Sequence, residues 1–351
     1  MKKIKLFIGL AIVLSLITYN VKAGKEKFVK KINNEYAINK DALLSVSNKY
    51  GDINCINWDK NVIAIDVTIT VVARNKEKAD DIFDRINIKI SGSKSKVEAV
   101  TEISNSSCSW DNGKFTIDYD IKMPKTVNLD ILNKYGCIFI EEVTGETDIT
   151  IKYGDLQVEK LLNENNNITV KYSNASFDFL EAGKLEIKYS DLEIDQSNKL
   201  NIETRFSDVK IDNTGYISFD SGYDDVEIDE VSEIYNESKF SSFEINRLIK
   251  NLDFNIEYGG CTVDNVLTGF NEIKIISKYA NVELDINSEA SYYLEADVKY
   301  GNLDYPESNS NVTKNKISHV ANKYEGTVGS NKNPKSKVIV NCTHGNVSLD
   351  D

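Results

Sequence analysis

The chain has 351 residues and a formal net charge of −13, with 28% charged and 9% aromatic residues. This acidic balance argues against nucleic acid or anionic lipid as a partner, because both would repel the chain. The length allows two or three ordinary domains, although a repeat architecture could occupy it as one continuous stack.

Residues 1–23 have the pattern of a secretory signal peptide. Three lysines among the first five residues precede an apolar run over 6–17, which is too short to span a membrane comfortably. Val21-Lys22-Ala23 suits cleavage before Gly24, with an uncleaved anchor as the alternative. Cleavage removes four lysines and no acids, so the mature charge is −13 − 4, or about −17. We expect an exported protein without a membrane span after cleavage, at the cell surface, outside the cell or in the periplasm.

The cysteines are five in number, widely spaced and without a Cys-x-x-Cys pair: Cys55, Cys108, Cys137, Cys261 and Cys342. The wide spacing disfavours both a zinc site and a dense disulfide framework. Cys55, Cys261 and Cys342 fall in the inward phase of the repeat described next. We expect these three to be small buried hydrophobic residues.

A degenerate repeat centred on Lys-Tyr-Gly-Asp runs through the chain. Between residues 135 and 300 its aromatic position recurs every 17 to 21 residues. The copies are at Tyr50, Tyr135, Tyr153, Tyr172, Tyr189, Phe206, Tyr223, Phe240, Tyr258, Tyr279 and Tyr300, with a last copy at His344.

Apolar residues alternate with polar ones on both sides of the aromatic position, as in strands that bury one face. They lie two and four positions before it, and three and five positions after it. Examples are Ile149, Ile151, Leu185, Ile187, Phe254 and Ile256 before it, and Leu156, Val158, Leu192, Ile194, Val226, Ile228, Val282 and Leu284 after it. The phase shifts across the Gly-Asp or Ser-Asp step, which predicts a tight corner with Gly, Ser, Asn or Asp in turn conformations.

These patterns predict an all-β fold, a parallel β-solenoid (β-helix) of short two-strand coils stacked about 4.8 Å apart. A lone coil cannot bury its apolar face, whereas stacked coils share one core. The alternative is an antiparallel sandwich or barrel with regular turns. Near-equal spacing and a fixed corner motif favour the solenoid.

The segments that flank the repeat differ from it. We expect an N-terminal coil and β-rich capping module over 24–130, with one helix that begins after Asn75 and runs to about Arg85. Such a module would cover a sheet edge that is otherwise open to aggregation. The solenoid repeats then fill 131–305. Residues 306–351 contain a lysine-rich insertion, expected to be a solvated loop, and a terminal coil.

The corners carry a resemblance to a known family. They read Lys134-Tyr135-Gly136, Lys152-Tyr153-Gly154-Asp155, Lys188-Tyr189-Ser190-Asp191 and Lys299-Tyr300-Gly301-Asn302, and a strand that ends at Met123-Pro124 leads toward the first of them. Together they resemble the putative-adhesin family of bacterial β-strand-repeat proteins, related to auto-transporter adhesin heads. The resemblance implies a secreted or surface-associated β-solenoid without catalytic residues.

Two sets of repeated residues are candidate sites. The corner acids Asp155, Asp191, Asp208 and Asp225 would stack about 5 Å apart, where calcium could bridge them. The alternative, which we favour because each turn supplies a single acid, is that each side chain bonds its own turn while facing solvent. The aromatic positions could form a sugar-stacking platform, but a packed core or a corner stack fits their inward phase better.

Isolated residues give weaker signals. Trp58 and Trp110 lie outside the aromatic series and are candidates for recognition or for the core of the capping module. His319 and His344 belong to no triad or metal arrangement. Overall, the sequence predicts a non-enzymatic exported protein, an adhesin or surface scaffold with an extended acidic solenoid and a glycan or protein as ligand. The alternatives are a periplasmic envelope component and a polysaccharide-active β-helix enzyme.

Overall fold

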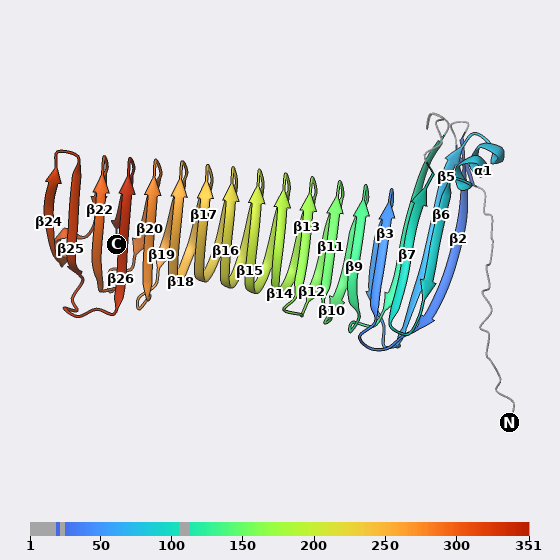
Figure 1. The fold of residues 1–351 in the computed structure, drawn as a ribbon, viewed down its shortest axis with the longest axis horizontal. Coiled ribbons are helices and arrows are strands. Elements are labelled where there is room, and N and C mark those ends of the chain that lie inside the picture. Colours follow the sequence, from blue (N-terminus) through green and yellow to red (C-terminus); the bar gives the residue numbers. More distant parts are fainter. Residues whose placement is uncertain (1–18, 22–24, 105–112, 351) are drawn as a thin grey trace, which may run out of the picture. The chain divides into compact units, whose positions relative to one another are not determined.

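The computed structural model describes residues 19–21, 25–104 and 113–350. Cys108, Trp110 and all but three residues of the expected signal peptide lie outside these ranges. The chain forms two compact units, residues 1–163 and 164–351. Strands make up most of the described residues, and the strands of the repeats stack in parallel as coils, so the predicted β-solenoid is confirmed (Figure 1). In the described part of the chain, no helix is long and apolar enough to cross a membrane.

Unit 1 combines the first coils with a set of longer strands. Its described elements are β1 (Tyr19–Val21), β2 (Lys25–Ala37), β3 (Leu43–Lys49), β4 (Ile53–Asn57), β5 (Val62–Ala73), α1 (Lys76–Phe83), β6 (Ile86–Gly92), β7 (Lys96–Ile103), β8 (Gly113–Met123), β9 (Asn128–Lys134), β10 (Ile138–Val143), β11 (Thr147–Lys152) and β12 (Asp155–Leu161). Asn75 caps α1 as predicted, because its side chain accepts a hydrogen bond from the Lys78 backbone at 3.0 Å.

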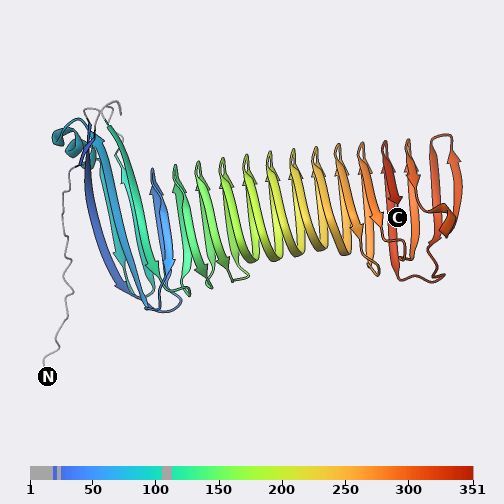
Figure 2. The ribbon, with the colours of Figure 1, turned by 180° about the vertical axis from the view of Figure 1, so that it is seen from behind.

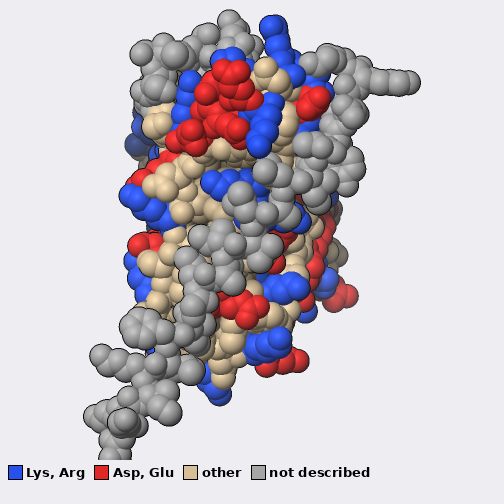
Figure 3. Space-filling view, turned by 90° about the vertical axis from the view of Figure 1, so that its right-hand side faces the viewer, with Lys and Arg blue, Asp and Glu red and all other residues tan. Residues whose placement is uncertain are grey.

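The first coil of unit 1 is β3 and β4, which pair in parallel with β9 and β10 of the next coil. On its other side β3 pairs with β7, and β4 pairs with β8. Antiparallel β6 then continues the first sheet, and β5 and β2 continue the second. Figure 3 views the protein from the right-hand side of Figure 1, and lysine and arginine side chains lie beside acidic ones on this surface. Lys27 and Lys31 are exposed on β2. β1 pairs with β2 over Lys25 to Lys27, and charges along the rest of β2 oppose pairing with another molecule.

Unit 2 contains the longest run of coils. Its described elements are β13 (Asn166–Lys171), β14 (Asn174–Lys188), β15 (Asp191–Arg205), β16 (Asp208–Gly222), β17 (Asp225–Lys239), β18 (Ser242–Glu257), β19 (Gly260–Val266), β20 (Glu272–Lys278), β21 (Asn281–Ile286), β22 (Tyr292–Lys299), β23 (Asn302–Asp304), η1 (Glu307–Asn309), β24 (Ser310–Ser318), β25 (Ala321–Val328), β26 (Ser336–Thr343) and β27 (Asn346–Asp350).

Parallel pairing keeps successive coils of unit 2 in register. From β14 to β17 each residue lies opposite the residue 17 positions later, so Asp191 pairs with Asp208 and Asp208 with Asp225. Equivalent residues therefore form rows that run along the stack. This register follows from the equal coil length, since a one-residue slip would turn the apolar positions outward.

The last coil in the sequence is not the last coil of the stack. β26 pairs in parallel with both β20 and β22, and β27 pairs with both β21 and β23 (Figures 1 and 2). His344 therefore lies between Tyr279 and Tyr300. The sequence order had predicted this coil at the end, and that prediction is wrong. In sequence order the outer coil (β22 and β23) comes first, and β26 and β27 then occupy the place between it and the coil of β20 and β21.

The lysine-rich segment is also different from the expected loop. β24 and β25 form an antiparallel hairpin, and β25 pairs with β22. The hairpin covers the outer coil of unit 2, and exposed Lys314 and Lys316 lie on its free strand. Part of the lysine charge is paired within the chain, through Lys323 to Asp297 and Lys337 to Glu295, both at 3.4 Å.

The core consists of the predicted inward residues. Ile187, Ile194, Ile211 and Ile228 have no exposed surface, and the other members of the two apolar rows are at most a few per cent exposed. Cys55, Cys261 and Cys342 are buried as predicted, whereas Cys137 is exposed. Burial raises the pKa of the Cys55 thiol to about 12, which suits a hydrophobic rather than a reactive role.

Replacement of Ile187 by Asp tests the inward assignment. The change places an unpaired carboxylate in the core, so we expect a loss of about 3–5 kcal/mol in the free energy of unfolding. Denaturant unfolding of the Ile187→Asp protein measures this loss. The matched control is Lys184→Asp on the exposed side of the same strand, for which we expect a change within about 0.5 kcal/mol. Equal stability of the two variants would show that the assignment is wrong.

Candidate binding surfaces

The aromatic positions form exposed ladders at the corners of the coils. In unit 1, Tyr135 stacks on Tyr50 at 5.1 Å and on Tyr153 at 5.0 Å between ring centroids, nearly parallel. In unit 2 the rings are 4.5–5.1 Å apart and tilted by at most 10°. The unit 2 ladder comprises Tyr172, Tyr189, Phe206, Tyr223, Phe240, Tyr258, Tyr279, His344 and Tyr300.

The ladder rings point outward, not into the core. The eight Tyr and Phe rings of unit 2 are 44–58% exposed. The predicted corner stack is therefore correct, and inward packing is wrong. Each interior ring has a neighbour against both faces, so only its edge and tip reach solvent. Because sugars stack on ring faces, the interior of the ladder offers no platform of that kind.

The ladder residues themselves adopt the left-handed backbone conformation. All twelve, including His344, have φ between 52° and 64°, whereas the sequence had assigned the unusual conformation to the Gly or Ser that follows. A side chain there costs about 1–2 kcal/mol. An offset ring stack contributes about 0.5–1.5 kcal/mol, so stacking offsets much of the cost. The corner sequence alone could not predict that stacking offsets the backbone strain, because the stacking partners come from neighbouring coils.

The residue after the ring is Gly, Ser or Ala at eleven of the twelve corners, because successive corners touch. A Cβ at Gly154 would lie 2.1 Å from the carbonyl oxygen of Gly136. Where serine occupies this position, its hydroxyl takes a structural role. The Ser173 N–H donates to Ser190 Oγ at 3.2 Å, and the Ser190 N–H donates to Ser207 Oγ at 3.4 Å.

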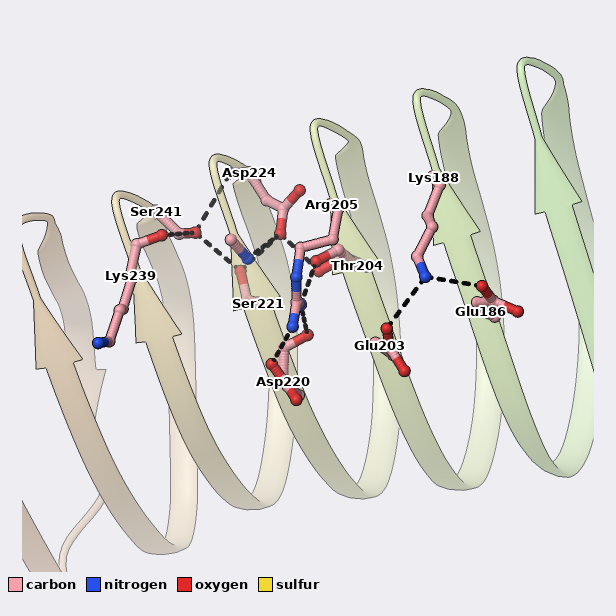
Figure 4. A network of polar contacts seen from close by, with 11 residues as sticks. Glu186, Lys188, Glu203, Thr204, Arg205, Asp220, Ser221, Asp224, Lys239 and Ser241 are labelled. Carbon is pink, nitrogen blue, oxygen red and sulfur yellow. Dashed lines mark hydrogen bonds and ion pairs between the residues drawn. The ribbon is translucent and has the colours of Figure 1, made fainter.

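Asp224 replaces serine at one corner and is 3% exposed. Its carboxylate accepts four hydrogen bonds of 2.7–2.9 Å, from Thr204 Oγ1, Ser221 Oγ and the backbone N–H groups of Ser207 and Gly222 (Figure 4). Four donors compensate for the loss of water around a buried carboxylate. The sequence showed only an Asp-Asp pair at this corner, and gave no sign that the first aspartate faces inward.

A basic row and an acidic row flank the unit 2 ladder. The basic row directly precedes the rings and consists of Lys171, Lys188, Arg205, Lys239, Lys278 and Lys299, interrupted by Gly222, Glu257 and Thr343. The acidic row lies two residues after the rings and consists of Asp191, Asp208 and Asp225. Lys188 bridges Glu186 at 2.7 Å and Glu203 at 3.2 Å, and Arg205 bridges Asp220 at 2.7 Å (Figure 4).

The calcium candidates lie one per coil. Asp191, Asp208 and Asp225 are neighbours in the acidic row of unit 2, and Asp155 begins β12 of unit 1. Among the residues that the structure describes, no group of three or more His, Cys, Asp or Glu side chains could hold a metal ion. Burial, followed by the charges of Asp191, Asp225 and Asp224, raises the pKa of the Asp208 carboxyl. The row is thus a line of like charges that repel one another.

Beyond the acidic row, the same sheet carries further acids, and we call this surface the acidic face. It comprises the outward positions two, four and six residues after the rings, from Asn174 to Asp285, and holds thirteen carboxylates and one lysine, Lys210. The carboxylates are Asp178, Asp191, Glu193, Asp195, Asp208, Asp212, Asp225, Glu227, Asp229, Glu244, Asp264, Glu283 and Asp285. The alternation of inward and outward positions in the repeat could have predicted this acidic face, but only the corner acids were identified from the sequence.

A groove lies on the other sheet of unit 2, which is formed by the strand segments that precede the rings in the sequence. Its lining includes Asn201, Ser218, Tyr235 and Asn255, together with a series of acids. One of these acids, Glu186, has a lowered pKa because Lys171 and Lys188 donate hydrogen bonds to it. A glycosidase general acid needs a raised pKa, so Glu186 is unsuited to that role.

Trp58 is half-buried in unit 1. Its indole N–H donates to the Val62 carbonyl at 2.7 Å, and the Lys60 ammonium lies 4.7 Å from the ring centroid. The side chain thus has partners within the chain, and a recognition role for it remains a prediction. The other candidate, Trp110, lies outside the described residues.

No protein-family model and no curated protein matches the chain. Solved structures that the chain is similar to include a putative cell adhesion protein from Clostridium sporogenes (11% identity, covering 92% of this chain and 99% of that chain, TM-score 0.17). A putative adhesin from Parabacteroides distasonis has 11% identity, covers 73% and 93%, and has a TM-score of 0.29. A putative lipid binding protein from the same species has 10% identity, covers 92% and 97%, and has a TM-score of 0.29. These values carry no inference about activity or ligand.

Replacement of Asp224 by Ala tests the buried network. The change leaves the Thr204 and Ser221 hydroxyls and two backbone N–H groups without their acceptor, so we expect a loss of about 2–4 kcal/mol in unfolding free energy. Urea unfolding provides the measurement. Asp225→Ala, at the exposed neighbouring position, is the matched control and should change stability by about 0.5 kcal/mol or less. The network would have no structural role if both variants behaved alike.

The acidic row predicts a pH dependence. A raised pKa means that folded Asp208 binds its proton more tightly than the unfolded chain, so its contribution to stability is present below the ordinary pKa of 3.8 and is lost as the pH rises through the folded pKa. Asp208→Asn should therefore stabilise the protein at pH 7 by about 0.5 kcal/mol and give no gain at about pH 3. Thermal unfolding at both pH values measures this, with Asp59→Asn in an exposed loop as control. A gain that persisted unchanged at low pH would contradict the electrostatic origin.

Proposed function

We propose that the protein is an exported, non-enzymatic adhesin or surface scaffold that presents the acidic face to a ligand. The acidic face carries this proposal, because thirteen carboxylates against one lysine are held in register on one sheet. Repeat proteins use such extended surfaces for binding, since many weak contacts add along them. A face of this charge favours a cationic glycan or a basic protein surface as the ligand and disfavours anionic polymers.

The location of the protein tests the proposal. Protease treatment of intact cells, compared with lysed cells, should remove the mature protein detected by an antibody, while a cytoplasmic marker survives. Protection until lysis would contradict surface display and favour a periplasmic envelope component. Salt-sensitive binding of the mature chain to intact cells, weakened at least tenfold by Glu227→Lys with Glu244→Lys, would then identify the acidic face as the contact surface.

A further inference from the structure

The exposed edge of the unit 2 ladder is a continuous apolar strip. Half of an aromatic side-chain surface of about 200 Å² remains open at each of the eight Tyr and Phe rings, which gives about 800 Å². Monomeric proteins rarely expose a contiguous apolar patch larger than about 300–600 Å². A standard stable interface buries about 800 Å² on each partner. The strip is therefore large enough to support a specific interface.

The strip is chemically complementary to the same strip on a second copy of the chain. A phenol hydroxyl both donates and accepts a hydrogen bond, so a row of tyrosine tips can satisfy an identical row. The spacing of 4.5–5.1 Å between rings is that of stacked β-coils, and a second copy reproduces it along its whole length. Because interior ring faces are already covered, a partner meets edges and hydroxyl groups only.

The two flanking rows determine the direction of a second copy. When that copy is turned by 180° about the ladder direction, its basic row lies opposite the acidic row of the first copy. Lys188 then faces the partner copy's row at the coil of Asp191, and Arg205 faces it at the coil of Asp208. Both contacts would add to the ion pairs that Lys188 and Arg205 already make within their own chain. The opposite, antiparallel arrangement places acid against acid and base against base, which is unfavourable.

We propose that the protein forms a parallel two-fold homodimer through the unit 2 ladders, with the basic row of each copy against the acidic row of the other. The two-fold axis runs along the stack, so both ladders are in register and the interface is closed. Each copy contacts its partner through the corner edge and the acidic row, which leaves open the acidic-face positions four and six residues after the rings, Glu227 and Glu244 among them. The dimer therefore does not cover the part of the acidic face that remains for a ligand.

Charge reversal tests the dimer and its direction. The first variant, Asp191→Lys with Asp208→Lys, makes both flanks basic at these two coils. The second, Lys188→Glu with Arg205→Glu, makes both flanks acidic at the same coils. Sedimentation velocity of the mature chain over a concentration series should show a dimer for the wild type and at least a tenfold weaker dimer for each variant. An equimolar mixture of the variants should restore the dimer as a heterodimer.

Controls separate this result from misfolding and from net charge. Each variant should keep the circular dichroism spectrum and cooperative unfolding of the wild type. Glu227→Lys with Glu244→Lys changes the net charge as much as the first variant does, but away from the ladder, and should leave the dimer intact. A monomeric wild type at all concentrations overturns the proposal. Variants that self-associate as tightly as the wild type overturn the parallel arrangement.

Discussion

Backbone hydrogen bonding between successive coils, parallel and in register, is the interaction on which the rest of this structure depends. Each coil alone has too little apolar surface to fold, and its edge N–H and C=O groups would be unpaired. Stacking satisfies both requirements together. It also turns every position of the repeat into a row, so that a residue type chosen once per coil becomes a continuous surface.

The corner shows how such rows create effects that no single coil has. A left-handed aromatic residue is unfavourable in one isolated turn, but in the aligned turns of one unit each interior ring gains a ring neighbour on both sides. The residue that follows is small at eleven of the twelve corners because the corner of a neighbouring coil contacts it directly. Strain, stacking and close approach are thus properties of the stack, and they have no counterpart in a single coil.

The same alignment has an electrostatic cost. Asp191, Asp208 and Asp225 repel one another because the register places them side by side, while lysines and glutamates before the ladder neutralise one another across coils. The two sheets of unit 2 therefore differ in character, one strongly acidic and the other a mixture of paired charges. This asymmetry gives the ladder two unlike flanks, and it leaves one sheet face free for a ligand.

The amino-acid sequence by itself determined the coil length, the strand phase and the buried rows, because these depend on local alternation repeated at a fixed period. Ile187, Cys261 and the other inward residues were identified in this way. Only the tertiary structure decided the outward turn of the rings, the burial of Asp224 and the position of His344 between Tyr279 and Tyr300. These features depend on contacts between residues 17 or more positions apart, and for His344 on a chain that returns into a gap. A repeat pattern read along the chain contains the rows, but not the order in which the coils are stacked.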